Sequence, residues 1–211
     1  MASRQFTGLD PERLRRRLAD VRERAGEGVE VLVACKYVPV EEMGALAEAG
    51  VELVGENRLG DLEAKRERWG DAFTWDFIGH VQSRKLKTIL PRVRLIHSVC
   101  TESVLGELGK HGTPDSEVLV QVDLASEDSK SGIPPDRLGE VIEECPVKVV
   151  GLSTMPPAVE RAEQSRRWFA RLAELAADHE LERLSMGTSQ DWEVAVEEGA
   201  TTIRIGSTLF E

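Results

Sequence analysis

The chain has 211 residues, 41% of them hydrophobic, which is enough to bury the core of one sizeable domain. Its formal net charge of −11 excludes a surface built for nucleic acid or anionic membranes, and no apolar stretch reaches the roughly 18 residues of a membrane-spanning helix. Three widely spaced cysteines and an N-terminus without an apolar signal core predict a cytoplasmic protein with free thiols, and the four histidines show no metal-ligand spacing.

The chain begins with a predicted helix and then alternates apolar runs with amphipathic stretches. The helix covers about 10–25, where Leu14, Leu18 and Val21 recur at helical spacing among arginines. The apolar runs predict eight strands, at about 29–38, 51–56, 76–80, 94–99, 117–124, 147–155, 183–188 and 201–208. The helical patterns between them lie at about 40–49, 58–69, 82–90, 101–111, 134–144, 159–179 and 190–198.

This alternation predicts the class of fold. Eight strands that alternate with helices favour a closed (β/α)₈ barrel over an open sheet. No long linker divides the chain, so we expect residues 1–211 to form a single TIM-barrel domain with an extra N-terminal helix. In such barrels the active site lies at the C-terminal ends of the strands.

Lys36 is the most informative residue, because the run Val29–Val38 around it otherwise reads as a buried strand. Parallel strands that are covered on both faces are nearly continuous apolar runs. An ammonium in such a run must be paired or become a neutral amine, and a neutral amine condenses with aldehydes to form Schiff bases. The alternative is a lysine at the strand end that reaches solvent.

The loops after the seventh and eighth strands have the features of a phosphate site. One contains Ser185, Gly187 and Ser189, and the other contains the run Gly206–Thr208. Small residues let backbone amides approach an anion, hydroxyls add donors, and TIM barrels often bind phosphate between these two loops. Ordinary turn chemistry would explain either loop alone, whereas both together favour phosphate.

Arg204 is a second charge within an apolar strand. The alternation of the eighth strand turns Ile203 and Ile205 towards the helices and Arg204 into the barrel. A buried arginine stays charged and needs an acceptor. Two interpretations stay open at this point: an ion pair with Glu56 or Asp76, or a contact with a heteroatom of a ligand.

Seven segments match one protein family, in order and along nearly the whole chain. Each is weak alone, but seven in order are specific. They are Val33–Lys36, Gly55–Asn57, Trp75–Lys85, Glu127–Gly132, Gly151–Met155, Leu184–Asp191 and Arg204–Phe210. On these residues the chain resembles the pyridoxal 5′-phosphate (PLP) homeostasis proteins, which are similar to the N-terminal barrel of bacterial alanine racemase.

The resemblance implies a PLP site with Lys36 as the aldimine-forming residue. It also implies that Arg204 faces the pyridine nitrogen. Because arginine keeps its proton, that nitrogen stays unprotonated and the ring is a poorer electron sink. Ser185, Gly206 and Ser207 are the implied phosphate contacts. The full implied set of cofactor-binding residues is Lys36, Asn57, Met155, Ser185, Met186, Arg204, Gly206, Ser207 and Thr208.

The chain departs from the family pattern at a few positions. Cys35 stands where serine is usual, Asp76 where histidine is frequent, and Thr188 where methionine is frequent. None of these changes removes an implied cofactor contact. We expect Asp76 to alter the polarity of the pocket rim, and Cys35 to be a small buried residue on the strand face opposite Lys36.

The resemblance favours a carrier over an enzyme. A racemase needs a second acid/base on the other face of the substrate carbon, and alanine racemase takes it from a tyrosine of a separate domain. The only tyrosine here is Tyr37, which we expect to project away from Lys36 because it follows it directly along the strand. The expected function is therefore PLP binding for vitamin B6 homeostasis, without turnover.

Two enzymatic alternatives stay open. One is a PLP-dependent amino-acid racemase or decarboxylase of low activity, with His80 as a substitute base. The other is a Schiff-base aldolase without cofactor. The expected partners are PLP and PLP-dependent apo-enzymes, with no nucleic acid or membrane, and a monomer is favoured over a dimer. The polar loop Glu127–Gly132 is expected to shape the pocket entrance or bind a partner.

Overall fold

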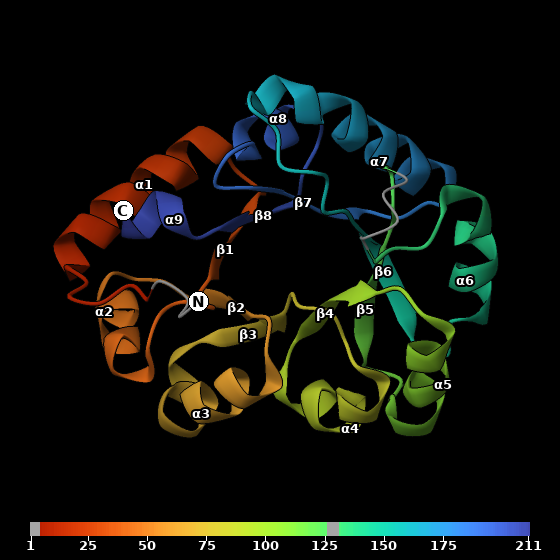
Figure 1. The fold of residues 1–211 in the computed structure, drawn as a ribbon, viewed down its shortest axis with the longest axis horizontal. Helices are drawn as coiled ribbons and strands as arrows, with labels where there is room; N and C mark the ends of the chain where they lie inside the picture. The colour runs from red at the N-terminus through yellow and green to blue at the C-terminus, as the bar shows by residue number, and fades with distance from the viewer. Residues whose placement is uncertain (1–4, 126–130) are drawn as a thin grey trace.

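The structure is a computed structural model that describes residues 5–125 and 131–211. Eight parallel strands close into a barrel in the order β1-β2-β3-β4-β5-β6-β7-β8, and helices surround it (Figure 1). The strands are β1 (Glu30–Ala34), β2 (Leu53–Glu56), β3 (Thr74–Phe77), β4 (Leu95–Val99), β5 (Glu117–Gln121), β6 (Lys148–Ser153), β7 (Arg183–Thr188) and β8 (Thr202–Ile205). The predicted barrel is confirmed, with strands shorter than most of the apolar runs.

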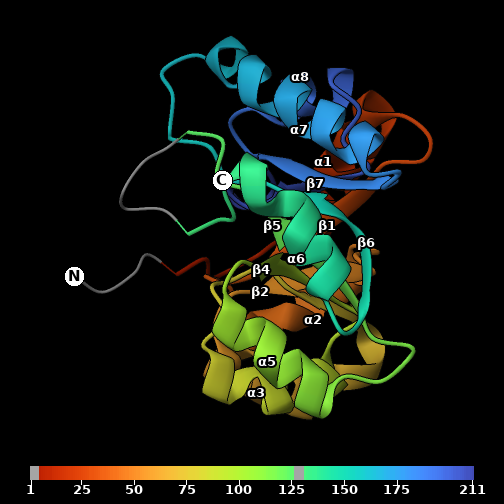
Figure 2. The ribbon, with the colours of Figure 1, turned by 90° about the vertical axis from the view of Figure 1, so that its right-hand side faces the viewer.

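Helices alternate with the strands along the chain. The α-helices are α1 (Pro11–Ala25), α2 (Met43–Glu48), α3 (Leu59–Trp69), α4 (Leu86–Ile89), α5 (Glu102–His111), α6 (Leu138–Glu144), α7 (Arg166–Asp178), α8 (Trp192–Glu197) and α9 (Ser207–Phe210). Seen from the side, α7 and α8 lie on one side of the barrel, and α3 and α5 on the opposite side (Figure 2). Among the residues that the structure describes, no helix is long and apolar enough to cross a membrane.

The N-terminal helix α1 completes the ring of helices. Asp10 caps its first turn by accepting hydrogen bonds from the amides of Glu12 and Arg13, at 2.9 and 3.3 Å. Its buried face, which includes Leu14 and Leu18, packs between α2 and α8 and against α9. The last helix, α9, has only four residues. α1 covers the outside of the barrel where β1 and β8 meet (Figure 1).

The two faces of the strands differ in chemistry. Outward-facing side chains such as Val33 and Ile203 belong to the apolar core between the barrel and its helices. Several inward positions carry buried polar side chains instead: Asp76, His97, Ser185 and Arg204. These four polar residues therefore lie in the barrel interior, although each belongs to a strand.

Gly79, just after β3, packs against the backbone of Asn57, just after β2. A Cβ atom at this position would overlap the carbonyl oxygen of Asn57 and lie 2.6 Å from its Cα. Backbone atoms cannot yield as a flexible side chain does, so we expect Gly79→Ala to destabilise the protein by about 1–3 kcal/mol. Urea unfolding followed by circular dichroism measures the change.

Gly60 on α3 provides the matched control, because a Cβ there would meet no atom within 4 Å. Gly60→Ala is expected to leave stability unchanged or to raise it by up to about 1 kcal/mol, since alanine is the better helix former. Equal unfolding midpoints for the two alanine variants would contradict the close approach at Gly79.

Candidate functional site

A cavity of about 700 Å³ opens at the C-terminal ends of the strands. This volume suits a small-molecule ligand, and the position is the one that TIM barrels use for their active sites. Six of the predicted site residues line it: Lys36, Asn57, Met155, Arg204, Gly206 and Ser207. Within the described residues, no group of three or more His, Cys, Asp or Glu side chains is arranged to hold a metal ion.

Lys36 lies just beyond the end of β1. The strand ends at Ala34, and the chain then turns, with the amide of Val38 bonded back to the carbonyl oxygen of Cys35 at 2.8 Å. The Lys36 side chain is half-buried and lines the cavity. The prediction of a lysine inside a continuous buried strand is therefore wrong, and the alternative of a lysine at the strand end holds.

Tyr37 shares the cavity with Lys36. Because both residues lie in the turn, the alternation of a strand does not separate them. The Nζ atom of Lys36 is 5.0 Å from the centroid of the Tyr37 ring, and both side chains line the cavity. The expectation that Tyr37 projects away from Lys36 is therefore wrong. The ring face attracts a cation at this distance and holds the lysine head group in the cavity.

A second lysine is buried behind Lys36. Lys65 on α3 forms an ion pair with Glu56 at the end of β2, and the two side chains are 4% and 0% exposed. The ammonium also donates to the carbonyl oxygen of Cys35 at 2.7 Å, while the other oxygen of Glu56 accepts from the amide of Asn57 at 3.0 Å. The pair thus links the backbone just before Lys36 to the backbone of Asn57.

Cys35 lies on this buried side, away from the cavity wall. Its Sγ atom is 3.4 Å from the carbonyl oxygen of Gly55 and 3.5 Å from Oε1 of Glu56. Burial and the neighbouring Glu56 carboxylate raise the pKa of the Cys35 thiol well above its ordinary value. The thiol therefore stays protonated and is not a nucleophile.

Arg204 points into the barrel from β8, as the alternation predicts. Its Nη1 donates to the carbonyl oxygen and the hydroxyl of Ser185, at 3.1 and 3.0 Å. Its Nη2 donates to the carbonyl oxygen of Thr154 at 2.7 Å and contacts Sδ of Met155 at 3.4 Å. Burial lowers the pKa of Arg204 to about 10, so the guanidinium is charged at neutral pH.

Neither carboxylate proposed from the sequence pairs with Arg204. Glu56 is engaged by Lys65, and Asp76 forms an ion pair with Arg94 at 2.7 Å. Asp76 is fully buried and does not line the cavity, so the expectation that it alters the pocket rim is wrong. Among the described ion pairs none includes Arg204, so the ion-pair interpretation is wrong, and the contact with a ligand stays a hypothesis.

The loops after β7 and β8 meet through Ser189. Its hydroxyl oxygen accepts from the amides of Gly206 at 3.0 Å and Thr208 at 3.3 Å, and its carbonyl oxygen accepts from the Thr208 hydroxyl at 3.3 Å. Two backbone N–H groups therefore converge on one oxygen atom at the cavity wall. A phosphate oxygen suits the same pair of donors.

The structure places three of the predicted site residues away from the cavity wall. Ser185 is fully buried on β7, and its hydroxyl is engaged by His97 at 2.8 Å and by Arg204. Met186, the next residue, faces the opposite way and is part of the apolar core. Thr208 reaches the site through its amide. The cavity is bordered by Ser189, which belongs to the predicted phosphate loop, and not by Ser185, which the resemblance implied.

Several cavity residues were not predicted from the sequence. His97 carried the same signal as Arg204, because it is a polar residue at an inward position of an apolar strand. Phe6 carried no such signal, since it reaches the cavity through the N-terminal segment, where its amide donates to the carbonyl oxygen of Tyr37 at 2.9 Å. Of the predicted loop Glu127–Gly132, only the last two residues are described, and Ser131 lines the cavity.

The barrel and its cavity define a domain of the type described as alanine racemase, N-terminal domain, and the profile of that family matches residues 9–211. The pyridoxal phosphate homeostasis protein of Aquifex aeolicus is 39% identical over 94% of this chain and 96% of its own length. PipY of Synechococcus elongatus, solved with PLP bound, is 30% identical and superposes with a TM-score of 0.81 over 94% of this chain and all of that one. The structure of PipY without PLP gives a TM-score of 0.83 at 29% identity, over 94% of this chain and 100% of that chain.

The chain belongs to the family of pyridoxal phosphate homeostasis proteins. The family predicted from the seven sequence segments is confirmed.

The buried ion pair behind Lys36 makes a testable contribution to stability. Lys65→Met leaves the Glu56 carboxylate buried without its partner, which is expected to cost about 3–5 kcal/mol. The exposed Lys87 gives a control with the same substitution, and Lys87→Met is expected to be neutral. Urea unfolding measures both variants.

The double variant Glu56→Gln/Lys65→Met tests the coupling, because it removes both charges together. We expect it to lose less stability than the sum of the two single variants. Additive losses would show that the two side chains do not stabilise each other.

Proposed function

We propose that this protein binds PLP in the cavity, holds it reversibly through the amine of Lys36, and so contributes to PLP homeostasis. The main support is one observation: a primary amine, a buried cation and the Ser189 hydroxyl, on which two backbone N–H groups converge, line a single cavity. When bound, PLP supplies an aldehyde that condenses reversibly with a primary amine. The similarity to PipY, whose structure was solved with PLP bound, supports the same ligand.

Arg204 suits the pyridine nitrogen of PLP. One of its N–H groups contacts the Met155 thioether at 3.4 Å. A thioether is a weak acceptor, so a ring nitrogen in its place would form a stronger hydrogen bond. Because the pKa of Arg204 is about 10, the guanidinium donates a hydrogen bond at neutral pH and keeps its proton. A ring nitrogen held in this way is a poor electron sink, which suits storage better than catalysis.

The phosphate group suits the cavity wall formed by the loops after β7 and β8. The amides of Gly206 and Thr208 converge on the Ser189 hydroxyl, and Ser207 lines the same wall. A phosphate oxygen at this position would accept from the two amides, while the hydroxyls of Ser189 and Ser207 offer further donors. Asn57 also lines the cavity, and the Glu56 carboxylate accepts a hydrogen bond from its backbone N–H.

The proposal is a carrier without catalytic turnover. Lys36 and Tyr37 come from the same turn and approach a ligand from the same side, so they do not supply acid and base on opposite faces of a substrate carbon. The shared cavity nevertheless keeps a racemase of low activity as the second candidate. Incubation with D- or L-alanine separates the two, because isomerisation that is lost in Lys36→Ala would favour the enzyme.

The proposed partners follow from the carrier function. PLP-dependent apo-enzymes receive the cofactor, and the protein acts as a cytoplasmic monomer. Size-exclusion chromatography with light scattering tests the monomer.

The covalent attachment point gives the first prediction for this function. The protein mixed with PLP is expected to show a near-visible absorbance band, and borohydride reduction followed by peptide mapping is expected to label Lys36. Lys36→Ala should lose both signals. Lys148→Ala is the control, because Lys148 is 65% exposed and begins β6 at the opposite end of the barrel. Reduction that labels a different lysine would refute the assignment.

The phosphate end gives a second prediction. Pyridoxal without phosphate keeps the aldehyde but lacks the group that the Gly206 and Thr208 amides receive. We expect its retention to be at least about tenfold weaker than that of PLP, since hydrogen bonds to a charged group are among the stronger ones. Absorbance titration with the two compounds gives the ratio. Equal retention would rule out a phosphate site between these loops.

A further inference from the structure

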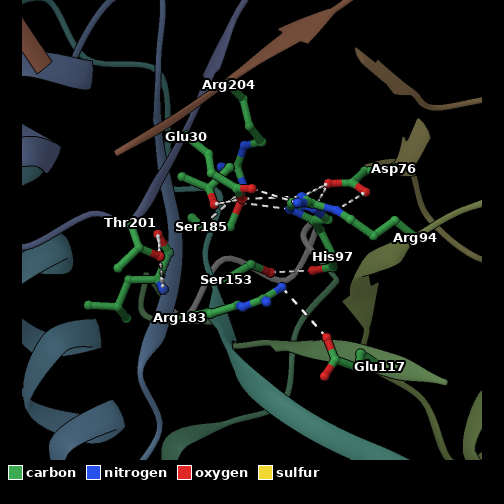
Figure 3. A network of polar contacts seen from close by, with 12 residues as sticks. Glu30, Asp76, Arg94, His97, Glu117, Ser153, Arg183, Ser185, Thr201 and Arg204 are labelled. Carbon is green, nitrogen blue, oxygen red and sulfur yellow. Dashed lines mark hydrogen bonds and ion pairs between the residues drawn. The ribbon is translucent and has the colours of Figure 1, made fainter. Parts of the chain in front are cut away.

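A chain of four buried polar side chains crosses the barrel interior, and two of them, His97 and Arg204, line the cavity (Figure 3). Oδ2 of Asp76 on β3 lies 3.1 Å from Nε2 of His97 on β4, and Nδ1 of His97 lies 2.8 Å from Oγ of Ser185 on β7. Nη1 of Arg204 on β8 donates to the same Oγ at 3.0 Å. Since β4 and β7 are not neighbours in the barrel, the contact between His97 and Ser185 spans its interior.

The carboxylate end of this chain is an ionised acceptor. Asp76 accepts from Nε and Nη2 of Arg94 at 3.0 and 2.7 Å. Burial alone would raise the pKa of Asp76, but the hydrogen bonds from His97 and Arg94 outweigh it and hold the pKa of the carboxyl below its ordinary value. An ionised carboxylate only accepts hydrogen bonds, so the facing nitrogen of His97 must carry a proton.

The direction of every other hydrogen bond follows from this. Burial lowers the pKa of His97, so the ring is neutral at physiological pH and carries one N–H, on Nε2. Nδ1 is then an acceptor, and it accepts the hydroxyl proton of Ser185. With its proton engaged in this way, the Ser185 oxygen presents only lone pairs to Arg204. Each member of the chain has one role that is consistent with its neighbours.

The chain orients Arg204 without neutralising it. A carboxylate beside the guanidinium would compete with any ligand acceptor, and no such pair is present among the described residues. A neutral hydroxyl fixes one end of the guanidinium, which leaves its charge for the cavity. The carboxylate that polarises the chain is two side chains away and is itself compensated by Arg94.

We propose that Asp76 is a positioning residue for Arg204, which it orients towards the ligand through His97 and Ser185. Asp76 does not border the cavity, so it acts only through the other two residues. This inference rests on the proposed function, because it deepens the role given there to Arg204.

The first test uses the protein without PLP. A long-range ¹⁵N–¹H correlation spectrum, with His97→Gln to assign the signals, is expected to show His97 as the tautomer protonated on Nε2. Asp76→Asn is expected to shift the His97 nitrogen signals, because the charged acceptor is lost. Glu30→Gln is the matched control: Glu30 also pairs with Arg94, at 2.5 Å, but it is not part of the chain. A proton on Nδ1, or unchanged signals in Asp76→Asn, would overturn the inference.

The second test measures PLP affinity by absorbance titration. Asp76→Asn and Ser185→Ala are each expected to bind about tenfold more weakly than the unmodified protein, as for loss of one hydrogen bond to a charged group, whereas Glu30→Gln should keep its affinity. Circular dichroism verifies folding, and Ser185→Ala decides the matter if Asp76→Asn does not fold. Equal affinities for Ser185→Ala and Glu30→Gln would refute the positioning role. If the unmodified protein does not retain PLP, the proposed function fails, and the tautomer measurement still decides whether the chain has the proposed direction.

Discussion

The site depends on the buried ion pair between Lys65 and Glu56. Two charges removed from water are stable only when further hydrogen bonds satisfy them. Here those bonds come from the cavity backbone, namely the carbonyl oxygen of Cys35 and the amide of Asn57. The pair and the cavity therefore depend on each other, because the ion pair is complete only when the ends of β1 and β2 are in place. Lys36 directly follows Cys35, whose carbonyl oxygen accepts from Lys65. The buried ion pair therefore helps to fix the position of Lys36.

The barrel separates its charges into two layers. Between the strands and the helices, Lys65 is compensated by Glu56, whereas inside the barrel Asp76 is compensated by Arg94. The described ion pairs leave out both cations of the cavity, Lys36 and Arg204. In a protein with a net charge of −11, Lys36 and Arg204 place two basic side chains at the wall of the cavity where an anionic aldehyde would bind.

The parts of this architecture that follow a short sequence period could be predicted. The alternation of β8 placed Arg204 in the barrel, and the succession of apolar runs gave the closed barrel. The turn after Ala34 could not be read from the sequence, because Lys36 and Tyr37 continue an apolar run whose strand ends early. The contact between His97 and Ser185 could not be predicted either. The two residues are 88 positions apart in the sequence and lie on strands that are not neighbours. Local patterns specify which face a residue occupies, whereas contacts across the barrel depend on closure.

The cavity mouth suits release as well as binding. The large hydrophobic side chains that the described chain exposes are Tyr37, at 38%, and Met155, at 50%, and both line the cavity. A catalytic site gains from excluding water around the reacting atoms, whereas the proposed carrier would need a linkage to Lys36 that water or another amine can reverse. If PLP binds as proposed, open access beside the amine and an arginine that keeps its proton would favour exchange over chemistry on a bound substrate. Open access would act on release of the aldehyde, and the arginine would act on the reactivity of the ring. A site with both features could bind a reactive aldehyde and still release it.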